Sequence, residues 1–226
     1  LMDTDVEKQI ELHFSALPRA TKKAMDFLSE QKWLKNTSWY LAGGTALALQ
    51  VGQRRSVDLD FFMTDSEFKS ESILRHFLNN ANRKTSFEEP NTIFGELFKA
   101  KISFIAYPFF VPENNFLKYG SIKILHKTDV AVMKIIAISQ RGRKRDFFDL
   151  YWCAKNLEPL IDILKKLKKQ YPSVAHDYHH ILKSLVYFAD AESDPDPEIY
   201  FKATWKEVKN FFRKEVPKVT REAMRL

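Results

Sequence analysis

Cysteine is nearly absent from the chain, and so are long apolar segments. The 226 residues contain one cysteine, Cys153, so no internal disulfide can form, which suits a reducing compartment. No general base lies near Cys153 in the sequence, and we interpret it as a buried small residue. The longest nearly apolar run, VAVMKIIAI, is interrupted by Lys134 and is too short to span a bilayer. The first residues, LMDTDVEKQI, do not resemble a secretory signal, so we expect a cytoplasmic protein with no membrane partner.

Internal repeats and low-complexity tracts are also missing. A hydrophobic content of 45% and an aromatic content of 14% are typical of a folded globular protein rather than a disordered one. The formal net charge of +7 favours polyanionic partners such as nucleotides or nucleic acid. A basic surface that only keeps the protein soluble would explain the same charge.

Apolar periodicity divides the chain into an α/β part and a helical part. In the first part we expect helices over 5–34 (broken near Pro18), 45–51 and 66–82, and strands over 39–41, 57–62, within 85–110, and 120–125. In the second part we expect helices over 128–139, 145–156, 158–171, 173–189 and 197–216. The sequence therefore predicts an α+β fold: a mixed or antiparallel sheet flanked by helices over 1–126, followed by a helical portion, 127–226, packed on it.

Two aspartates interrupt the apolar strand pattern VDLDFF. Val57, Leu59 and Phe61 alternate with Asp58 and Asp60, so both carboxylates are expected on one face of the strand. Like charges on neighbouring positions of one half-buried face repel each other, which costs stability unless cations neutralise them. Carboxylate oxygens are the ligands that Mg²⁺ prefers. The pattern therefore predicts that Asp58 and Asp60 hold Mg²⁺ or Mn²⁺.

A Gly-Gly-Thr segment lies between two predicted strands. Gly43 and Gly44 are expected to form a tight turn, and Thr45 is expected to cap the helix that follows. Such a turn offers unhindered N–H groups and a hydroxyl to phosphate oxygens. Metals bound by an adjacent pair of carboxylates stabilise the attacking and leaving oxygens of a phosphoryl displacement. Each motif alone is common, but the order strand, turn, helix, strand favours a nucleotide-binding site.

In this order the motifs resemble those of nucleotidyltransferases of the DNA polymerase beta superfamily, whose signature is Gly-Gly or Gly-Ser followed by Asp-x-Asp. More closely, GGTALAL and RRSVDLDFF resemble the AbiEii/AbiGii toxin-type nucleotidyltransferases, including Arg54 and Ser56 ahead of the acids. Downstream, DVAVMK resembles the family's Asp-x-x-x-x-Lys helix, and RDFFDLY resembles its Arg-Asp-x-x-Asp motif. The resemblance covers about residues 39–155 and none of the later helices.

The resemblance implies a metal-dependent nucleotidyltransferase that moves a nucleotide from a nucleoside triphosphate (NTP) to an acceptor and releases pyrophosphate. It implies that the triphosphate is bound by Gly43, Gly44, Thr45, Lys134 and Arg145. It implies catalytic roles for Asp58, Asp60, Asp146 and Asp149, with Asp146 or Asp149 positioning or activating the acceptor. The implied biological role is the toxin of a bacterial toxin–antitoxin or phage-defence pair, with RNA such as tRNA as acceptor and an antitoxin protein as partner.

The later motif residues are open to other interpretations. Lys134 either extends along the helix surface to solvent or reaches a phosphate. Asp146 and Asp149 share the helix face opposite the predicted core stripe, where they would cap and solvate the helix N-terminus. Arg145 belongs to a basic loop, QRGRKRD, that binds a triphosphate or an RNA backbone, or is simply solvated.

One position departs from the pattern of the family. Active members of the superfamily usually carry a third carboxylate on a later strand, whereas AKISFIAY holds Ser103, a poor Mg²⁺ ligand and no general base. Glu96, Asp146 or Asp149 could supply the missing charge. Otherwise the chain is a catalytically degenerate protein that binds a nucleotide or nucleic acid. A phosphatase fits less well because the expected sheet is largely antiparallel, and a sugar-nucleotide transferase would leave the Gly-Gly-Thr turn unexplained.

Overall fold

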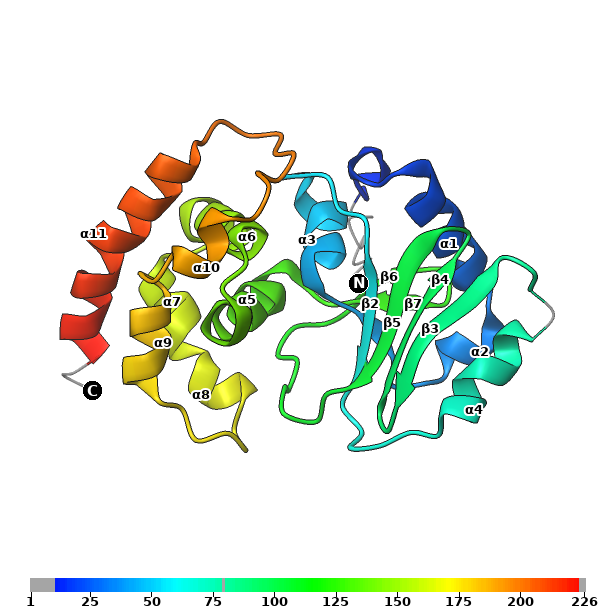
Figure 1. Ribbon diagram of the computed structural model, residues 1–226. Helices are drawn as coiled ribbons and strands as arrows, with labels where there is room; N and C mark the ends of the chain where they lie inside the picture. The colour runs from blue at the N-terminus through cyan, green and yellow to red at the C-terminus, as the bar shows by residue number, and fades with distance from the viewer. Residues whose placement is uncertain (1–10, 79, 224–226) are drawn as a thin grey trace, which may run out of the picture.

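The computed structural model describes residues 11–78 and 80–223, and it has an α/β half and a helical half (Figure 1). The strands are β1 Tyr40–Leu41, β2 Leu59–Met63, β3 Arg83–Glu89, β4 Thr92–Leu97, β5 Ala100–Ala106, β6 Leu117–Tyr119 and β7 Ile122–Ile124. The helices that precede or interrupt them are η1 Phe14–Ala16, α1 Arg19–Ser29, α2 Lys32–Lys35, α3 Gly43–Val51, α4 Ser70–Leu74 and η2 Arg75–Phe77. The helices that follow are α5 Lys127–Arg141, α6 Lys144–Asn156, α7 Leu160–Lys165, α8 Leu167–Gln170, α9 Tyr178–Ser184, α10 Ala189–Glu192 and α11 Trp205–Ala223.

The strands form one mixed sheet in the order β3-β4-β5-β2-β1-β7-β6. The pairs β2–β5 and β1–β7 are parallel, and the other neighbours are antiparallel, so of the predicted mixed or antiparallel sheet the mixed form is observed. In the register of β2 with β5, Asp60 lies directly beside Ser103. The hairpin between β3 and β4 turns at Asn91, whose φ of 64° suits a tight turn.

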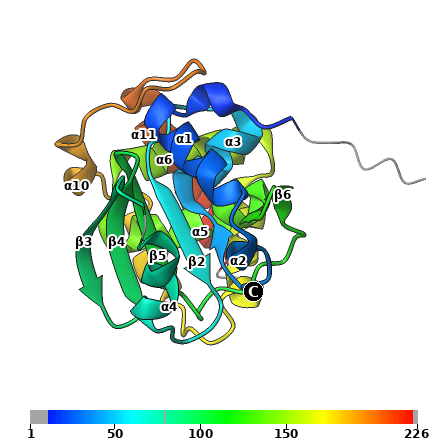
Figure 2. The same ribbon diagram turned by 90° about the vertical axis from the view of Figure 1, so that its right-hand side faces the viewer.

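The two faces of the sheet are covered by different helices (Figures 1 and 2). Helices α1, α2 and α4 lie over one face, where Phe104 packs in the core with Phe77 and Trp33. Helix α3 and the helical half lie on the other face, at the side of β2 and β1. Since side chains alternate along a strand, β2 places Leu59, Phe61 and Met63 in the core and turns Asp60 and Phe62 to the helical side.

The helical half has its own aromatic core. Phe147 of α6 packs against Phe188, Trp205 and Phe212, at ring-centroid distances of 5.2 to 5.7 Å. Helix α11 carries Trp205 and Phe212 and crosses the outer side of this half. Cys153 is fully buried in α6, which confirms the interpretation that it is a core residue.

Several expected elements differ in length. The helix expected over 66–82 is only the short α4 followed by the 3₁₀ turn η2, and the helix expected over 158–171 is divided into α7 and α8. The first part of the helix expected over 5–34 lies outside the described residues. The last strand ends at Ile124, and the boundary near residue 126 between two domains stays a prediction. Within residues 11–78 and 80–223, no helix is long and apolar enough to cross a membrane.

Candidate active site

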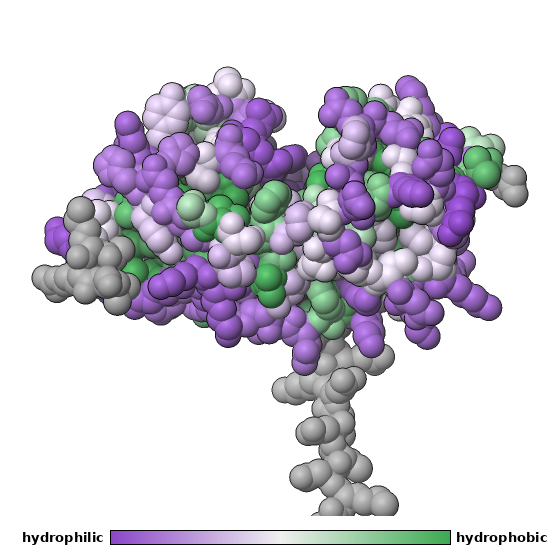
Figure 3. Space-filling view, turned by 90° about the horizontal axis from the view of Figure 1, so that it is seen from below, coloured by the Kyte–Doolittle hydropathy of each residue, from purple (hydrophilic) through white to green (hydrophobic). Residues whose placement is uncertain are grey.

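A cavity of about 340 Å³ lies between the β2 side of the sheet and helix α5. The view from below shows the corresponding notch between the two halves of the molecule (Figure 3). One end of the cavity is polar and is lined by Gly43, Gly44, Asp58, Asp60, Lys134, Arg141 and Arg145. The other end is largely apolar and is lined by Phe62, Phe94, Ile105, Tyr107, Met133 and Ile136. A charged end and an apolar end suit a ligand that is itself charged at one end and flat and apolar at the other.

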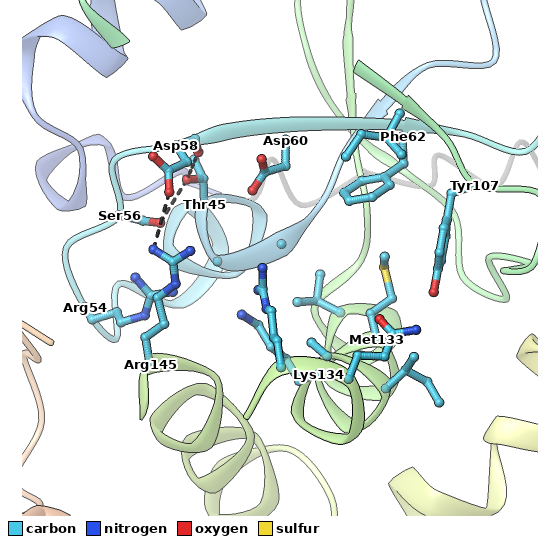
Figure 4. A pocket seen from close by; sticks show the side chains of 18 of the residues that line it. Thr45, Arg54, Ser56, Asp58, Asp60, Phe62, Tyr107, Met133, Lys134 and Arg145 are labelled. Carbon is cyan, nitrogen blue, oxygen red and sulfur yellow. Dashed lines mark hydrogen bonds and ion pairs between the residues drawn. The ribbon is translucent and has the colours of Figure 1, made fainter. Parts of the chain in front are cut away.

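The polar end is built around the two aspartates of the strand pattern. Asp58 precedes β2 and Asp60 lies within it, and Figure 4 shows both above the helix that carries Lys134 and Met133. Nη1 of Arg145 lies 3.4 Å from Oδ2 of Asp58, and both side chains are partly exposed. This long contact leaves the Asp58 carboxylate accessible from the cavity.

Asp60, like Asp58, is partly exposed, but it lies within the sheet and is held by a neighbouring strand. The hydroxyl of Ser103 donates a hydrogen bond of 2.8 Å to Oδ1 of Asp60. Burial raises the pKa of the Asp60 carboxyl, and Asp58 raises it further, whereas Ser103 and the nearby arginines lower it less. The protein therefore holds a carboxylate whose charge is only partly compensated by its own side chains, as a cation-binding position requires.

The glycine turn lies beside these acids. Gly43 has φ +67°, a left-handed conformation that favours glycine, and a Cβ there would lie 3.3 Å from Oδ2 of Asp60. Thr45 does not cap α3, because the N-cap residue is Ala42. Its buried hydroxyl instead donates to the carbonyl of Asp58 and accepts a hydrogen bond of 2.9 Å from the hydroxyl of Ser56. Thr45 thereby fixes the helix to the segment that carries Asp58.

Substitution of Gly44 by alanine is expected to lower the free energy of unfolding by about 1–3 kcal/mol. A Cβ at Gly44 would lie 2.1 Å from Nη2 of Arg54, which is itself bonded to Asp149 at 2.8 Å. Relief of this clash breaks that bond, which outweighs the gain of about 1 kcal/mol that alanine brings to a helix. Urea unfolding measures the change. In an Arg54→Met background the same substitution should cost less, and an equal cost in both backgrounds would contradict the explanation.

A network of five charged residues, four of them buried and Arg141 half exposed, joins the two halves behind the cavity. Nζ of Lys134 lies 2.6 Å from Asp146 and 2.6 Å from Asp149. Arg54 binds both oxygens of Asp149, at 2.7 and 2.8 Å, and Arg141 contacts Asp146 at 3.0 Å. The side chains of both aspartates are fully buried, and those of Lys134 and Arg54 are nearly so. The network ties the segment that follows α3 to α5 and α6.

The environment of Asp146 and Asp149 in this network differs from the solvated helix end that the sequence suggested. Burial alone raises the pKa of the Asp149 carboxyl, but Arg54 and Lys134 together hold it below its usual range. Burial likewise raises the pKa of Asp146, and the charges of Lys134 and Arg141 lower it more. Both acids are thus ionised, and the three cations exceed them by one positive charge. That excess lies beside the cavity, where it favours an anionic ligand.

Asp146 and Asp149 do not line the cavity. The interpretation that they cap and solvate the end of α6 is wrong, since their helix face packs on α5 and α3 and is neutralised by cations. A direct role for either acid on the acceptor stays a prediction, and the observed contacts are those of residues that position Lys134 and Arg54. Lys134 does not extend to solvent: it is buried and still lines the cavity.

The basic loop QRGRKRD is divided between two roles. Arg141 and Arg145 line the cavity. Arg143 pairs with Asp194 at 2.9 Å and Lys144 with Asp196 at 3.0 Å, so these two residues anchor the segment before α11. Glu96, the alternative source of a third carboxylate, does not line the cavity.

Sequence reasoning assigned no role to Arg54, Phe62, Tyr107 or Met133, all of which line the cavity. For Arg54, the available signal was its place within RRS, between a helix and a strand with buried positions. The aromatic residues gave no separate signal, because an aromatic residue in a strand is usually a core residue. Asp129 matched the family motif but is buried away from the cavity, where it accepts hydrogen bonds from Asn114 and Gln170.

The donor set at the polar end fits a magnesium ion better than a transition metal. Within the described ranges, no group of three or more His, Cys, Asp or Glu side chains could hold a metal. Two cavity-lining carboxylates remain, Asp58 and Asp60. Mg²⁺ is commonly bound by one or two carboxylates together with the phosphates of a substrate, so this pair suffices only when a phosphate ligand is present.

Known proteins share both the sequence and the fold. The family model "Nucleotidyl transferase AbiEii toxin, Type IV TA system" matches residues 26–103 and 91–224. The uncharacterized protein aq_aa25 of Aquifex aeolicus is 37% identical over 187 residues, which cover 79% of this chain and 86% of that protein. MenT4, a nucleotidyltransferase toxin of Mycobacterium tuberculosis, is 15% identical with a TM-score of 0.54, covering 85% of this chain and 79% of MenT4. An H. pylori protein provisionally described as a nucleotidyltransferase is 16% identical with a TM-score of 0.52, covering 92% of this chain and 98% of that one. These structural likenesses confirm the predicted α+β nucleotidyltransferase fold.

Proposed function

Because this chain belongs to the AbiEii nucleotidyl transferase toxin family and is a nucleotidyltransferase, we propose that it moves a nucleotide from an NTP to an acceptor and releases pyrophosphate. The observation that carries the proposal is the cavity itself. Two carboxylates, a glycine turn and several cations converge at its polar end. The reaction is a displacement at the α-phosphorus, in which the acceptor oxygen forms the new bond and pyrophosphate leaves.

In this proposal the NTP lies along the cavity. Its triphosphate contacts the Gly43–Gly44 turn, Lys134 and Arg145, where the positive charge is concentrated. Its base lies at the apolar end, near Phe62, Tyr107 and Met133. The Asp146–Lys134–Asp149 contacts of 2.6 Å hold the ammonium group in place before substrate arrives, so its position is not lost to side-chain freedom.

Asp58 and Asp60 would hold Mg²⁺ or Mn²⁺, which supplies charge stabilisation to the phosphate oxygens. Ser103 fixes the orientation of the Asp60 carboxylate through the hydrogen bond to Oδ1. The other oxygen, Oδ2, lies near Gly43, on the side from which a phosphate would approach. Arg145, at 3.4 Å from Asp58, is close enough to exchange that carboxylate for a phosphate oxygen.

We further propose that the acceptor is an RNA such as tRNA, and that the protein is a cytoplasmic toxin controlled by an antitoxin protein. The family description and the resemblance to MenT4, itself a nucleotidyltransferase toxin, support this role. The net charge of +7 agrees with a nucleic-acid acceptor. A second candidate is a nucleotide-binding protein of the same fold without transferase activity, and Ser103 at the position of the third carboxylate favours it.

Transfer of label decides between the two candidates. The purified protein is incubated with each α-³²P-labelled NTP, Mg²⁺ or Mn²⁺ and total bacterial RNA, with an Asp58→Ala, Asp60→Ala double variant as control. We expect label on RNA only with the native acids, and the preferred base identifies the donor. Metal-dependent NTP binding without any transfer would favour the binding protein instead.

A further inference from the structure

A row of four cross-strand neighbours leads from the proposed catalytic centre to the edge of the sheet. Asp60 on β2 lies beside Ser103 on β5, Ser103 beside Phe94 on β4, and Phe94 beside Phe87 on β3. Paired residues of neighbouring strands share one face of a sheet, at a strand spacing of about 4.8 Å. The two phenylalanines are therefore roughly 10 and 14 Å from Asp60, on the face that carries it.

These two phenylalanines are exposed. Phe94 is 41% and Phe87 is 43% accessible to solvent, and their ring centroids are 5.6 Å apart. Phe94 lines the apolar end of the cavity, whereas Phe87 does not line the cavity and lies on β3, the edge strand of the sheet (Figure 2). The pair forms a continuous apolar surface from the cavity outward, which we call the aromatic shelf. An exposed aromatic surface that adjoins a binding cavity indicates a ligand that extends beyond the cavity.

Basic side chains lie next to the shelf on the same face. Two residues from Ser103 along β5 is Lys101, and across the sheet from Lys101 lie Glu96 and then Lys84. Both lysines are exposed, and Lys101 lies toward the Asp58 side of the row. The face therefore combines two aromatic rings with two cations and one anion, a composition suited to a polyanion with flat apolar groups.

We propose that the aromatic shelf stacks the unpaired bases at the end of an RNA acceptor. This proposal rests on the proposed function, because the acceptor oxygen must approach Asp58 and Asp60 from outside the NTP. A strand that lies over Phe87 and Phe94 enters the cavity past Phe94, and its phosphates pass Lys84 and Lys101. Only unpaired bases expose their faces for such stacking, so the acceptor end is single-stranded. The shelf suits a protein partner less well than RNA, because its apolar area consists of only two side chains.

The test measures RNA binding and transfer separately. The probe is a short single-stranded RNA with a 5′ fluorescein, compared by anisotropy with the blunt duplex of the same sequence. In Phe87→Ala we expect the affinity for the single strand to fall roughly 5- to 150-fold, the equivalent of about 1–3 kcal/mol for one stacked base. NTP binding should not change, because Phe87 does not line the cavity. Phe87→Trp should restore binding, whereas Phe87→Leu should not.

Tyr187→Ala is the matched control, since it removes an aromatic side chain that is 52% exposed on the helical half. The same loss of RNA affinity in this variant, or none in Phe87→Ala, would overturn the shelf. So would a loss of antitoxin binding in Phe87→Ala with RNA affinity intact. If the native protein binds single-stranded RNA through Phe87 but transfers no label, the proposed role of the shelf is supported and the proposed transferase function is contradicted. If transfer occurs and Phe87→Ala does not alter the Michaelis constant for RNA, the proposed transferase function is supported and the proposed role of the shelf is contradicted.

Discussion

Replacement of Asp60 by asparagine is expected to reduce nucleotide transfer by about 10²–10³-fold or more while leaving the fold at least as stable. Asparagine has the same shape, and its side-chain oxygen can still accept the hydrogen bond that Ser103 donates. The substitution removes a charge whose burial raises the pKa of the carboxyl, so the folded state loses an unfavourable charge. Activity and stability are therefore expected to change in opposite directions, which a merely structural residue would not produce.

The measurement combines initial rates of label transfer at saturating Mg²⁺ with thermal unfolding in the absence of NTP. Asp162→Asn on α7 serves as the control, because its side chain is half exposed and does not line the cavity. We expect that control to match the native protein in both measurements. Native-like transfer by Asp60→Asn would remove Asp60 from the metal site, and a large loss of stability would show that its charge is satisfied within the fold.

The positions of the two aspartates were predictable because they depend on a local rule. In a strand, side chains alternate between faces, so VDLDFF alone places Asp58 and Asp60 together. The expected strand of AKISFIAY was found as β5, and its register brings Ser103 beside Asp60. The glycine turn is local in the same sense. Thr45 lies where it was predicted, at the start of the helix, but its predicted capping contact is wrong. A hydroxyl that can cap a helix can equally bond to a neighbouring segment.

The charged network was not predictable, because its members are distant in sequence. Arg54 and Asp149 are 95 residues apart, and each alone suggests a solvated side chain. Only the packing of α6 against α3 and α5 brings them together and buries them.

The helix expected over 66–82 was predicted too long for a different reason. Short helices depend on tertiary packing more than on propensity, and an amphipathic pattern does not reveal where that packing ends.

Removal of the Asp149 carboxylate is expected to lower the free energy of unfolding by about 3–5 kcal/mol. In Asp149→Ala, Arg54 loses both of its bonds to the carboxylate, and Lys134 retains only Asp146. The native network buries Lys134 and Arg54 with two carboxylates, so the variant would leave these two buried cations with the single carboxylate of Asp146, which the exposed Arg141 also contacts. Urea unfolding at neutral pH measures the loss.

A double variant distinguishes two contributions to the free energy of unfolding: the cost of leaving Arg54 unpaired, and the stabilisation that the Arg54–Asp149 pair itself provides. Arg54→Met with Asp149→Leu removes both partners and leaves Lys134 and Arg141 with Asp146. Because a buried ion pair can often be replaced by apolar residues at little cost, this double variant should be more stable than Asp149→Ala alone. A double variant less stable than the single one would show that the pair itself, and not the unpaired cation, accounts for the stability.

The double variant also shows what the buried acids contribute to the reaction. Because Arg54 itself lines the cavity, the double variant is compared with Arg54→Met alone. If Asp149 acts by holding Lys134 at the cavity, the double variant should bind NTP more weakly and transfer more slowly than Arg54→Met. If Asp149 contacts the acceptor, the two variants should bind NTP equally while transfer is lost only in the double variant. The buried position of Asp149, with Lys134 between it and the cavity, favours the first result. On that basis the helical half is as much a part of the nucleotide site as the strand that carries Asp58 and Asp60.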